Sequence, residues 1–343
     1  MNTKIALPMV LAGSVLLAGC LDDDDDDNDL AGTQSILEIA VENENTTILE
    51  AAVLAADPSI AALLDGDDPL TVFAPTDAAF QALLADLGVD AQTVLDDTAL
   101  LNAVLPYHVL ATSVGTVTSD AAINVAQNPV PGNLVPTVNG ENVALSISQE
   151  DGADVLYVNT SRVTGPDVFA TNGVVHLIDK VLIPPPSDLS DTDSTIAEIV
   201  VALANPADPA DAEFTILLQA LQTGGAAALL DAASDPDSTL TVFAPTDAAF
   251  EALLAELGIT AGELLADPNL PSILSQHILG TEVGSLTAYA SNGGTVTTLA
   301  GNNLNVDIQN NALVIEGSTV IEADVEASNG VIHVIDTVIA TVD

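Results

Sequence analysis

The hydrophobic and polar positions of the chain follow a helical period first and a strand-like pattern later, and this order occurs twice. Between residues 35 and about 56, apolar positions recur at helical spacing, and Ser35 with Glu38 fits a capping box at the start. Another apolar stretch covers 59–64, and short β-rich runs separated by Gly, Asn and Pro fill 112–183. Helices before strands predict an α+β domain or a helix-decorated β-sandwich rather than alternating βαβ units.

The sequence TVFAPTDAAF occurs at 71–80 and again, letter for letter, at 241–250. Its β-branched and aromatic start predicts a strand, which the proline ends because proline lacks a backbone donor. Thr76 or Asp77 is expected to cap a following helix, as are Thr246 or Asp247 in the second copy. The turn contains no glycine and no Lys follows it, so the motif indicates a folding signal rather than a phosphate cradle.

The expected helix carries an apolar stripe and a stop signal in both copies. Positions i, i+3, i+4 and i+7 are apolar, which predicts one buried face. The first copy has Phe80, Leu83, Leu84 and Leu87 before Gly88, and the second has Phe250, Leu253, Leu254 and Leu257 before Gly258. The glycine after each stripe predicts a left-handed helix end.

Composition excludes one class of partner. The 343 residues include 50 acidic residues but only Lys4, Arg162 and Lys180 as basic ones, which gives a formal charge of −47. Because phosphate binding depends on Lys and Arg, no nucleic-acid function is expected. Charge repulsion of this size is tolerated where salt screens it, so we expect a saline or halophilic source and exposure to the medium.

The N-terminus predicts a secretory signal and a lipid anchor. Lys4 precedes an apolar stretch at 5–17, and Leu-Ala-Gly-Cys closes the segment at Cys20, the single cysteine of the chain. This resembles a bacterial lipoprotein signal, which implies cleavage after residue 19 and lipidation of Cys20; a plain secretory signal is the alternative. Leu21 after the cysteine favours the outer membrane, with the protein on its periplasmic side or at the cell surface.

Two polar segments separate the predicted units. The segment 20–34 contains six consecutive Asp residues at 22–27, which indicate a solvated spacer, although calcium binding is an alternative. The segment 185–193 follows a proline run and indicates a stiff linker. The predicted domains therefore cover 35–184 and 194–341.

Three blocks recur in the same order in both domains: the decapeptide, a Tyr-His or Gln-His pair, and an Asn-Gly-Val-x-His-x-Ile-Asp block. Together they resemble the fasciclin (FAS1) domain, over nearly all of the mature chain. The resemblance implies a wedge-shaped β-sandwich decorated with several short helices, found in extracellular adhesion and matrix proteins and in bacterial secreted proteins. Gln276 stands where the first copy has Tyr107, so a binding role of the Tyr-His pair cannot apply to both domains.

The four histidines, His108, His176, His277 and His333, all lie in these blocks. Neither domain has an HExxH motif or a short His pair, and no Gly-x-Ser-x-Gly elbow is present, so no catalytic residue, metal site or cofactor is predicted. Structural histidines are favoured over ligands. The candidate contact residues are these histidines together with Thr76, Asp77, Tyr107, Thr246 and Asp247.

The sequence thus predicts a lipid-anchored, non-enzymatic envelope protein that mediates adhesion or contact with a protein or matrix component. One alternative is a periplasmic carrier, which requires a deep apolar pocket in each domain. The other is a hydrolase or metal-assisted catalyst that uses His108 and His176.

Overall fold

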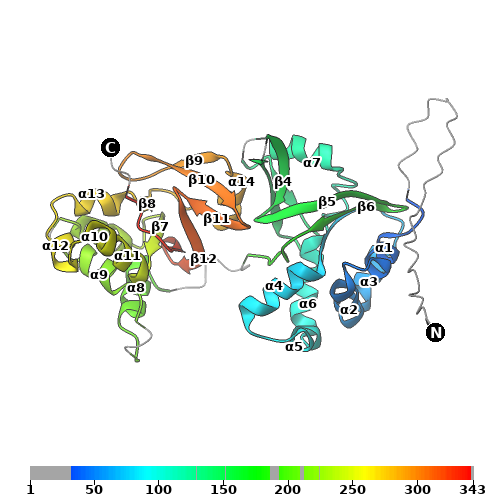
Figure 1. Cartoon of the computed structure of the whole chain (residues 1–343), viewed down its shortest axis with the longest axis horizontal. Coiled ribbons are helices and arrows are strands. Elements are labelled where there is room, and N and C mark those ends of the chain that lie inside the picture. The colour runs from blue at the N-terminus through cyan, green and yellow to red at the C-terminus, as the bar shows by residue number, and fades with distance from the viewer. Residues whose placement is uncertain are drawn as a thin grey trace, which may run out of the picture. The chain divides into compact units, whose positions relative to one another are not determined.

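The computed structural model describes residues 32–128, 130–150, 152–185, 193–208, 212–223 and 225–340. Two domains with closely similar element order make up this part of the chain, and each is described by itself (Figure 1). The predicted signal segment, Cys20, the aspartate run and most of the linker lie outside the described residues.

The first domain begins with helices and continues with strands, as the sequence pattern predicts. Its helices are α1 (Ile36–Glu42), α2 (Thr47–Ala55), α3 (Pro58–Leu64), α4 (Asp77–Leu87), α5 (Ala91–Asp96), α6 (Thr98–Val104), the 3₁₀ helix η1 (Leu105–His108) and α7 (Ser119–Ala126). Its strands are β1 (Leu70–Pro75), β2 (Leu134–Pro136), β3 (Asn142–Glu150), β4 (Ala153–Val158), β5 (Ser161–Ala170) and β6 (Gly173–Ile178).

These strands form one bent sheet in the order β1-β6-β5-β4-β3-β2. Strands β1 and β6 are parallel, the other pairs are antiparallel, and two register shifts interrupt β5 against β6. Because bulges increase local bending, β5 can belong to both halves of the sheet. Isolated bridges Val72–Val109 and Leu110–Thr137 connect the ends. In Figure 1, α1–α6 lie on one side of β5 and β6, and α7 lies on the other.

The bend creates two apolar cores in the first domain. One lies between the early helices and the sheet and includes Ile36, Leu70 and Phe80. The other lies inside the bend, where Phe73 of β1 and Leu145 of β3 belong to the same buried cluster. The α+β class and the sandwich-like packing are therefore confirmed, with the refinement that one continuous sheet supplies both faces.

The second domain repeats this plan. Its helices are α8 (Ile196–Ala204), α9 (Thr215–Leu221), α10 (Ala227–Ser234), α11 (Asp247–Leu257), α12 (Ala261–Leu265), α13 (Leu270–Ser275) and α14 (Ser285–Ala290). Its strands are β7 (Leu240–Pro245), β8 (Ile278–Leu279), β9 (Gly294–Thr297), β10 (Asn303–Gln309), β11 (Ala312–Ile315), β12 (Ser318–Ala327) and β13 (Gly330–Ile335), in the order β8-β7-β13-β12-β11-β10-β9.

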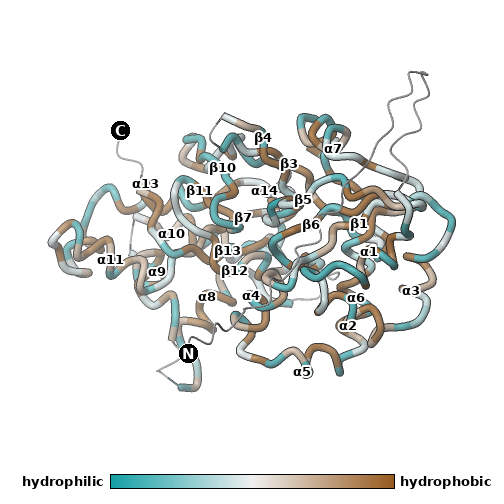
Figure 2. Tube along the Cα trace, turned by 45° about the vertical axis from the view of Figure 1, so that its right-hand side comes forward, coloured by the Kyte–Doolittle hydropathy of each residue, from teal (hydrophilic) through white to brown (hydrophobic). Residues whose placement is uncertain are grey.

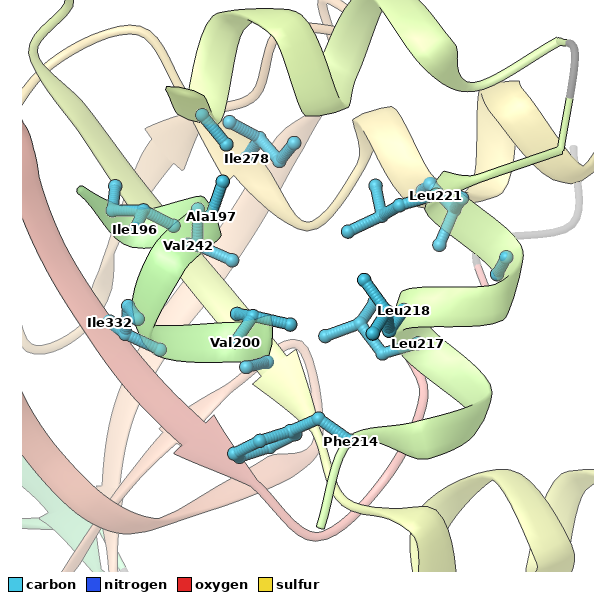
Figure 3. Close-up of a cluster of buried hydrophobic side chains, with 14 of the residues drawn as sticks. Ile196, Ala197, Val200, Phe214, Leu217, Leu218, Leu221, Val242, Ile278 and Ile332 are labelled. Carbon is cyan, nitrogen blue, oxygen red and sulfur yellow. The ribbon is translucent and has the colours of Figure 1, made fainter. Parts of the chain in front are cut away.

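Aliphatic side chains from helices and strands meet in the core of the second domain. Figure 3 shows Ala197 and Val200 of α8 opposite Leu217 and Leu221 of α9, with Ile278 of β8 beside them. The shared apolar pattern of the two copies thus produces the same helix-on-sheet packing twice.

Two sequence predictions need correction. The segment 35–56 is two helices rather than one, because the chain turns at 43–46 between α1 and α2. The apolar stripe of α4 is buried only at its start: Phe80 is 5% exposed, whereas Leu87 is 55% exposed. In α11, Leu257 is likewise 56% exposed. The capping box of Ser35 with Glu38 and the left-handed Gly88 and Gly258 are confirmed.

Candidate functional site

The polar residues of the decapeptide hold the fold together. The Thr71 hydroxyl donates to the Gly115 carbonyl (2.9 Å) and accepts from the Val117 N–H (2.8 Å). Thr76 caps α4 by accepting from the Ala79 N–H (3.3 Å). In the second copy, Thr246 accepts from the Ala249 N–H (3.0 Å). Each threonine therefore satisfies backbone groups within its own domain.

Asp77 caps a different helix from the one that it begins. Its carboxylate accepts from the Ile48 N–H (2.8 Å) and the Thr47 hydroxyl (2.7 Å), at the N-terminus of α2. The hydroxyl of Thr46, at the N-cap position, donates instead to backbone carbonyls. Asp77 thus supplies the acceptor and negative charge that this helix end favours. In the second copy, Asp247 binds Thr215 and the Ile216 N–H (2.9 Å) at the start of α9.

Tyr107 and His108 lie side by side in η1, and both are buried. The Tyr107 hydroxyl donates to the Asn142 carbonyl (2.8 Å) and accepts from the Asn159 amide (3.0 Å), and burial raises its pKa. His108 Nε2 accepts from the Leu182 N–H (2.9 Å), so Nδ1 carries the proton and donates to the Val104 carbonyl (2.8 Å). His277 bridges Ile273 and Ile339 in the same way.

Burial lowers the pKa of both His108 and His277 to about 4. The neutral imidazole is the form that the fold uses, because protonated Nε2 could not accept from the facing N–H group.

His176 and His333 use the opposite tautomer. The Asp167 N–H donates to His176 Nδ1 (3.2 Å), and Nε2–H donates to the Val117 carbonyl (2.8 Å). His333 bridges the Asp324 N–H and the Val283 carbonyl at the same distances. Burial lowers the pKa of both imidazoles.

A Ser, Asp and His set converges in each domain: at the start of α7 in the first, and at the start of α14, with Ser285, Asp324 and His333, in the second. The Ser119 hydroxyl and N–H both bind the Asp167 carboxylate, and His176 Nδ1 lies 4.0 Å from Asp167 Oδ1. A nucleophile needs a base within hydrogen-bonding reach. Both ring nitrogens of His176 are already paired with backbone groups, so the arrangement positions α7 and does not activate Ser119.

The metal-assisted catalyst and the periplasmic carrier are tested by the metal ligands and the cavities of the described residues. Within the described residues, no three His, Cys, Asp or Glu side chains are grouped as metal ligands. The apolar cavity between helices and sheet measures about 20 Å³ in each domain. That volume holds about one water molecule, so it is too small for a carried ligand.

Asn172 has a structural role that the sequence does not predict. Its Asn-Gly pair indicates only a turn. Asn172 donates to the Leu64 and Gly66 carbonyls (2.9 and 2.7 Å) and accepts from the Ile36 N–H (2.9 Å). Asn329 makes the equivalent contacts in the second domain. The amide joins three segments, and only its place before glycine in the repeated block could have indicated it.

The glycine that follows Asn172 is required by close packing. Gly173 has φ +146°, and a Cβ there would lie 2.0 Å from the Leu70 carbonyl oxygen. Gly330 is equivalent, with φ +139° and a distance of 1.9 Å to the Leu240 oxygen. The polar and glycine residues of all three blocks therefore hold together the junction between early helices and late strands.

The candidate contact residues are thus mostly internal. Tyr107, His108, His176, His277 and His333 are at most 3% exposed. Thr76, Asp77, Thr246 and Asp247 are used as helix caps. The buried rings are therefore out of reach of any partner. In the described part of the chain, every helix falls short of the length and apolar character needed to span a bilayer.

Comparison with known proteins gives the family. A fasciclin domain model matches residues 36–184 and 212–341. Transforming growth factor-beta-induced protein ig-h3 of Sus scrofa is 30% identical over 275 residues, which cover 80% of this chain and 35% of that protein. Protein sll1483 of Synechocystis is 40% identical over 151 residues, which cover 44% of this chain and 74% of that protein.

A solved FAS1 domain pair from the insect cell adhesion molecule fasciclin I is 20% identical, with a TM-score of 0.36 over 86% of this chain and 96% of that one. The chain spans about a third of the length of the ig-h3 relative that it matches. Because the family model matches most of both repeats, the chain belongs to the fasciclin domain family and carries two such domains in tandem.

Proposed function

We propose that this protein is a lipid-anchored component of a bacterial cell envelope that mediates adhesion or protein contact through its two fasciclin domains. The observation that carries the proposal is the internal use of the family blocks: their polar side chains bind backbone groups of their own domain. A domain whose histidines and aspartates are hydrogen-bonded to its own backbone acts through its outer surface rather than through a reactive centre.

Anchoring rests on the Leu-Ala-Gly-Cys sequence that ends at Cys20 and on the acidic spacer that follows it. An extended spacer covers at most about 3.5 Å per residue, enough to hold the first domain clear of lipid headgroups. The partner is a protein or matrix component outside the cytoplasm.

Membrane fractionation of the host tests the proposal. The Cys20→Ser chain is expected in the soluble or secreted fraction, whereas the control Ser14→Ala in the same segment stays membrane-bound.

Deleting the gene is expected to reduce attachment of cells to each other or to a surface. The intact chain restores attachment, and Cys20→Ser does not. Membrane retention of Cys20→Ser contradicts anchoring, and unchanged attachment in the deletion strain contradicts adhesion.

A further inference from the structure

The helix encoded by the duplicated decapeptide runs past the end of the core that buries its start. In α4, exposure rises from 5% at Phe80, through half-buried Leu83 and Leu84, to 55% at Leu87. In α11, it rises from 1% at Phe250 to 56% at Leu257. The same apolar end is thus presented by both domains.

The short helix that follows extends this surface. After Gly88 the chain enters α5, which has no fully buried residue, and Val89 at the junction is 37% exposed. Figure 2 shows hydrophobic colouring along α5. We define the elbow of the first domain as Leu83, Leu84, Leu87 and Val89, and that of the second as Leu253, Leu254, Leu257 and Ile259. Leu83, Leu253, Leu254 and Ile259 are partly buried against the core of their own domain, so the exposed members are Leu87, Val89 and Leu257.

Exposed acidic residues lie close to both elbows in the sequence. Asp86, Asp90 and Asp96 are exposed in the first domain, as are Glu251, Glu256 and Glu263 in the second. The sequence from 194 to 343 contains no Lys or Arg at all. In the first domain, the charge of Asp86 opposes the lowering of the Lys180 pKa by desolvation. Lys180 is an exposed residue, and its ammonium donates to the Thr160 hydroxyl (3.3 Å).

The charge around the elbows decides among possible occupants. A second copy would bring like charges together, and an anionic lipid surface would be repelled. A segment that combines leucine-like residues with Lys or Arg matches both the exposed Leu87, Val89 and Leu257 and the acidic residues next to them in the sequence. We infer that each elbow is a docking site for a cationic amphipathic helix of a partner protein, so that one chain offers two such sites. This inference rests on the proposed role in protein contact.

Peptide binding to the purified chain carrying Cys20→Ser tests the inference. The probe is a fluorescent helical peptide of Leu and Lys, and a peptide of equal charge with Ser for Leu reports purely electrostatic attraction. Fluorescence anisotropy is measured at about 0.15 M and about 1 M NaCl, because salt screens the electrostatic part. The Leu-Lys peptide is expected to keep measurable affinity at the higher salt, and the Ser-Lys peptide to lose it.

Removing the apolar ends should separate the elbows from the rest of the surface. Leu87→Ser with Leu257→Ser is expected to weaken binding of the Leu-Lys peptide about tenfold, since each leucine would otherwise become buried on docking. Each single variant should leave one site of parent affinity. The matched control is Ile321→Ser on β12, which is 57% exposed in the chain and lies outside the elbows.

Parent-like affinity in the double variant, or equal weakening by Ile321→Ser, overturns the inference. Two other results also overturn it. One is a doubled mass by light scattering that depends on the exposed leucines, which would show that a second copy occupies the elbows. The other is leucine-dependent binding of the chain to phosphatidylglycerol vesicles without peptide. Circular dichroism confirms that the variants are folded. The assay uses purified components and is independent of the membrane and attachment tests. A failure of the docking inference can therefore be distinguished from a failure of the proposed function.

Discussion

At the scale of single residues, the structure explains why polar side chains occur in otherwise apolar blocks. His108 and Asn172 each join backbone groups from segments far apart in the sequence. A buried donor or acceptor left without a partner costs about 1–3 kcal/mol, so such residues tolerate little change.

The histidines make stability depend on pH. The folded pKa of His108 and His277, about 4, is below the ordinary value of 6.5, so the fold favours the neutral ring. Their contribution is fully present above about pH 6.5 and is lost as pH falls towards 4, by about 3 kcal/mol for each histidine. We expect the free energy of unfolding in urea to fall across this window.

This effect is measured at high salt. Protonation of surface carboxylates near pH 4 relieves charge repulsion and so raises the free energy of unfolding, opposite to the effect of the histidines, and salt screens that repulsion. The variant His108→Gln cannot titrate and is expected to show a shallower pH dependence than the parent. A parent whose stability is flat between pH 6.5 and 5 would contradict the burial of neutral imidazoles.

At the scale of elements, the decapeptide is a unit that begins one helix and caps another. Asp77 connects the start of α4 to the start of α2, and Asp247 connects α11 to α9. The sequence predicts a cap but places both Thr76 and Asp77 at the start of the following helix, because local spacing carries no information on which other helix end lies nearby.

The cross-helix cap can be tested by substitution. Asp77→Ala is expected to destabilise the first domain by about 1–2 kcal/mol, because α2 loses an acceptor for a backbone N–H group and a favourable charge at its N-terminus. Asp86→Ala, at an exposed position of the same helix α4, serves as the control and should change stability little. Equal effects of the two substitutions in urea denaturation would show that Asp77 acts only through net charge.

At the scale of the whole molecule, the dominant property is a formal charge of −47 with three basic residues. The described ion pair that Arg162 makes with Glu150, at 3.1 Å, compensates little of this charge. The resulting repulsion is screened over about 3 Å in 1 M salt but over about 30 Å in 0.01 M salt.

We expect the free energy of unfolding to rise from low salt to about 1 M NaCl. NaCl and KCl at equal ionic strength should give similar gains if screening is the cause, whereas a large difference would point to specific cation binding. Stability that stays constant or falls with salt would contradict the predicted saline environment.

The sequence by itself determined the repeat, the α+β order, the helix stops and the family, because these depend on local propensity and on spacing along the chain. It also placed Ser35, Thr76 and Gly88 at helix ends, where the signal is contained within a few residues. Tertiary structure alone decided which side chains are internal. Burial of Tyr107, capping of α2 by Asp77 and exposure of Leu87 all depend on where the core ends in space. A helical stripe fixes which residues share a face, but only the packed sheet fixes how far along the helix that face is covered.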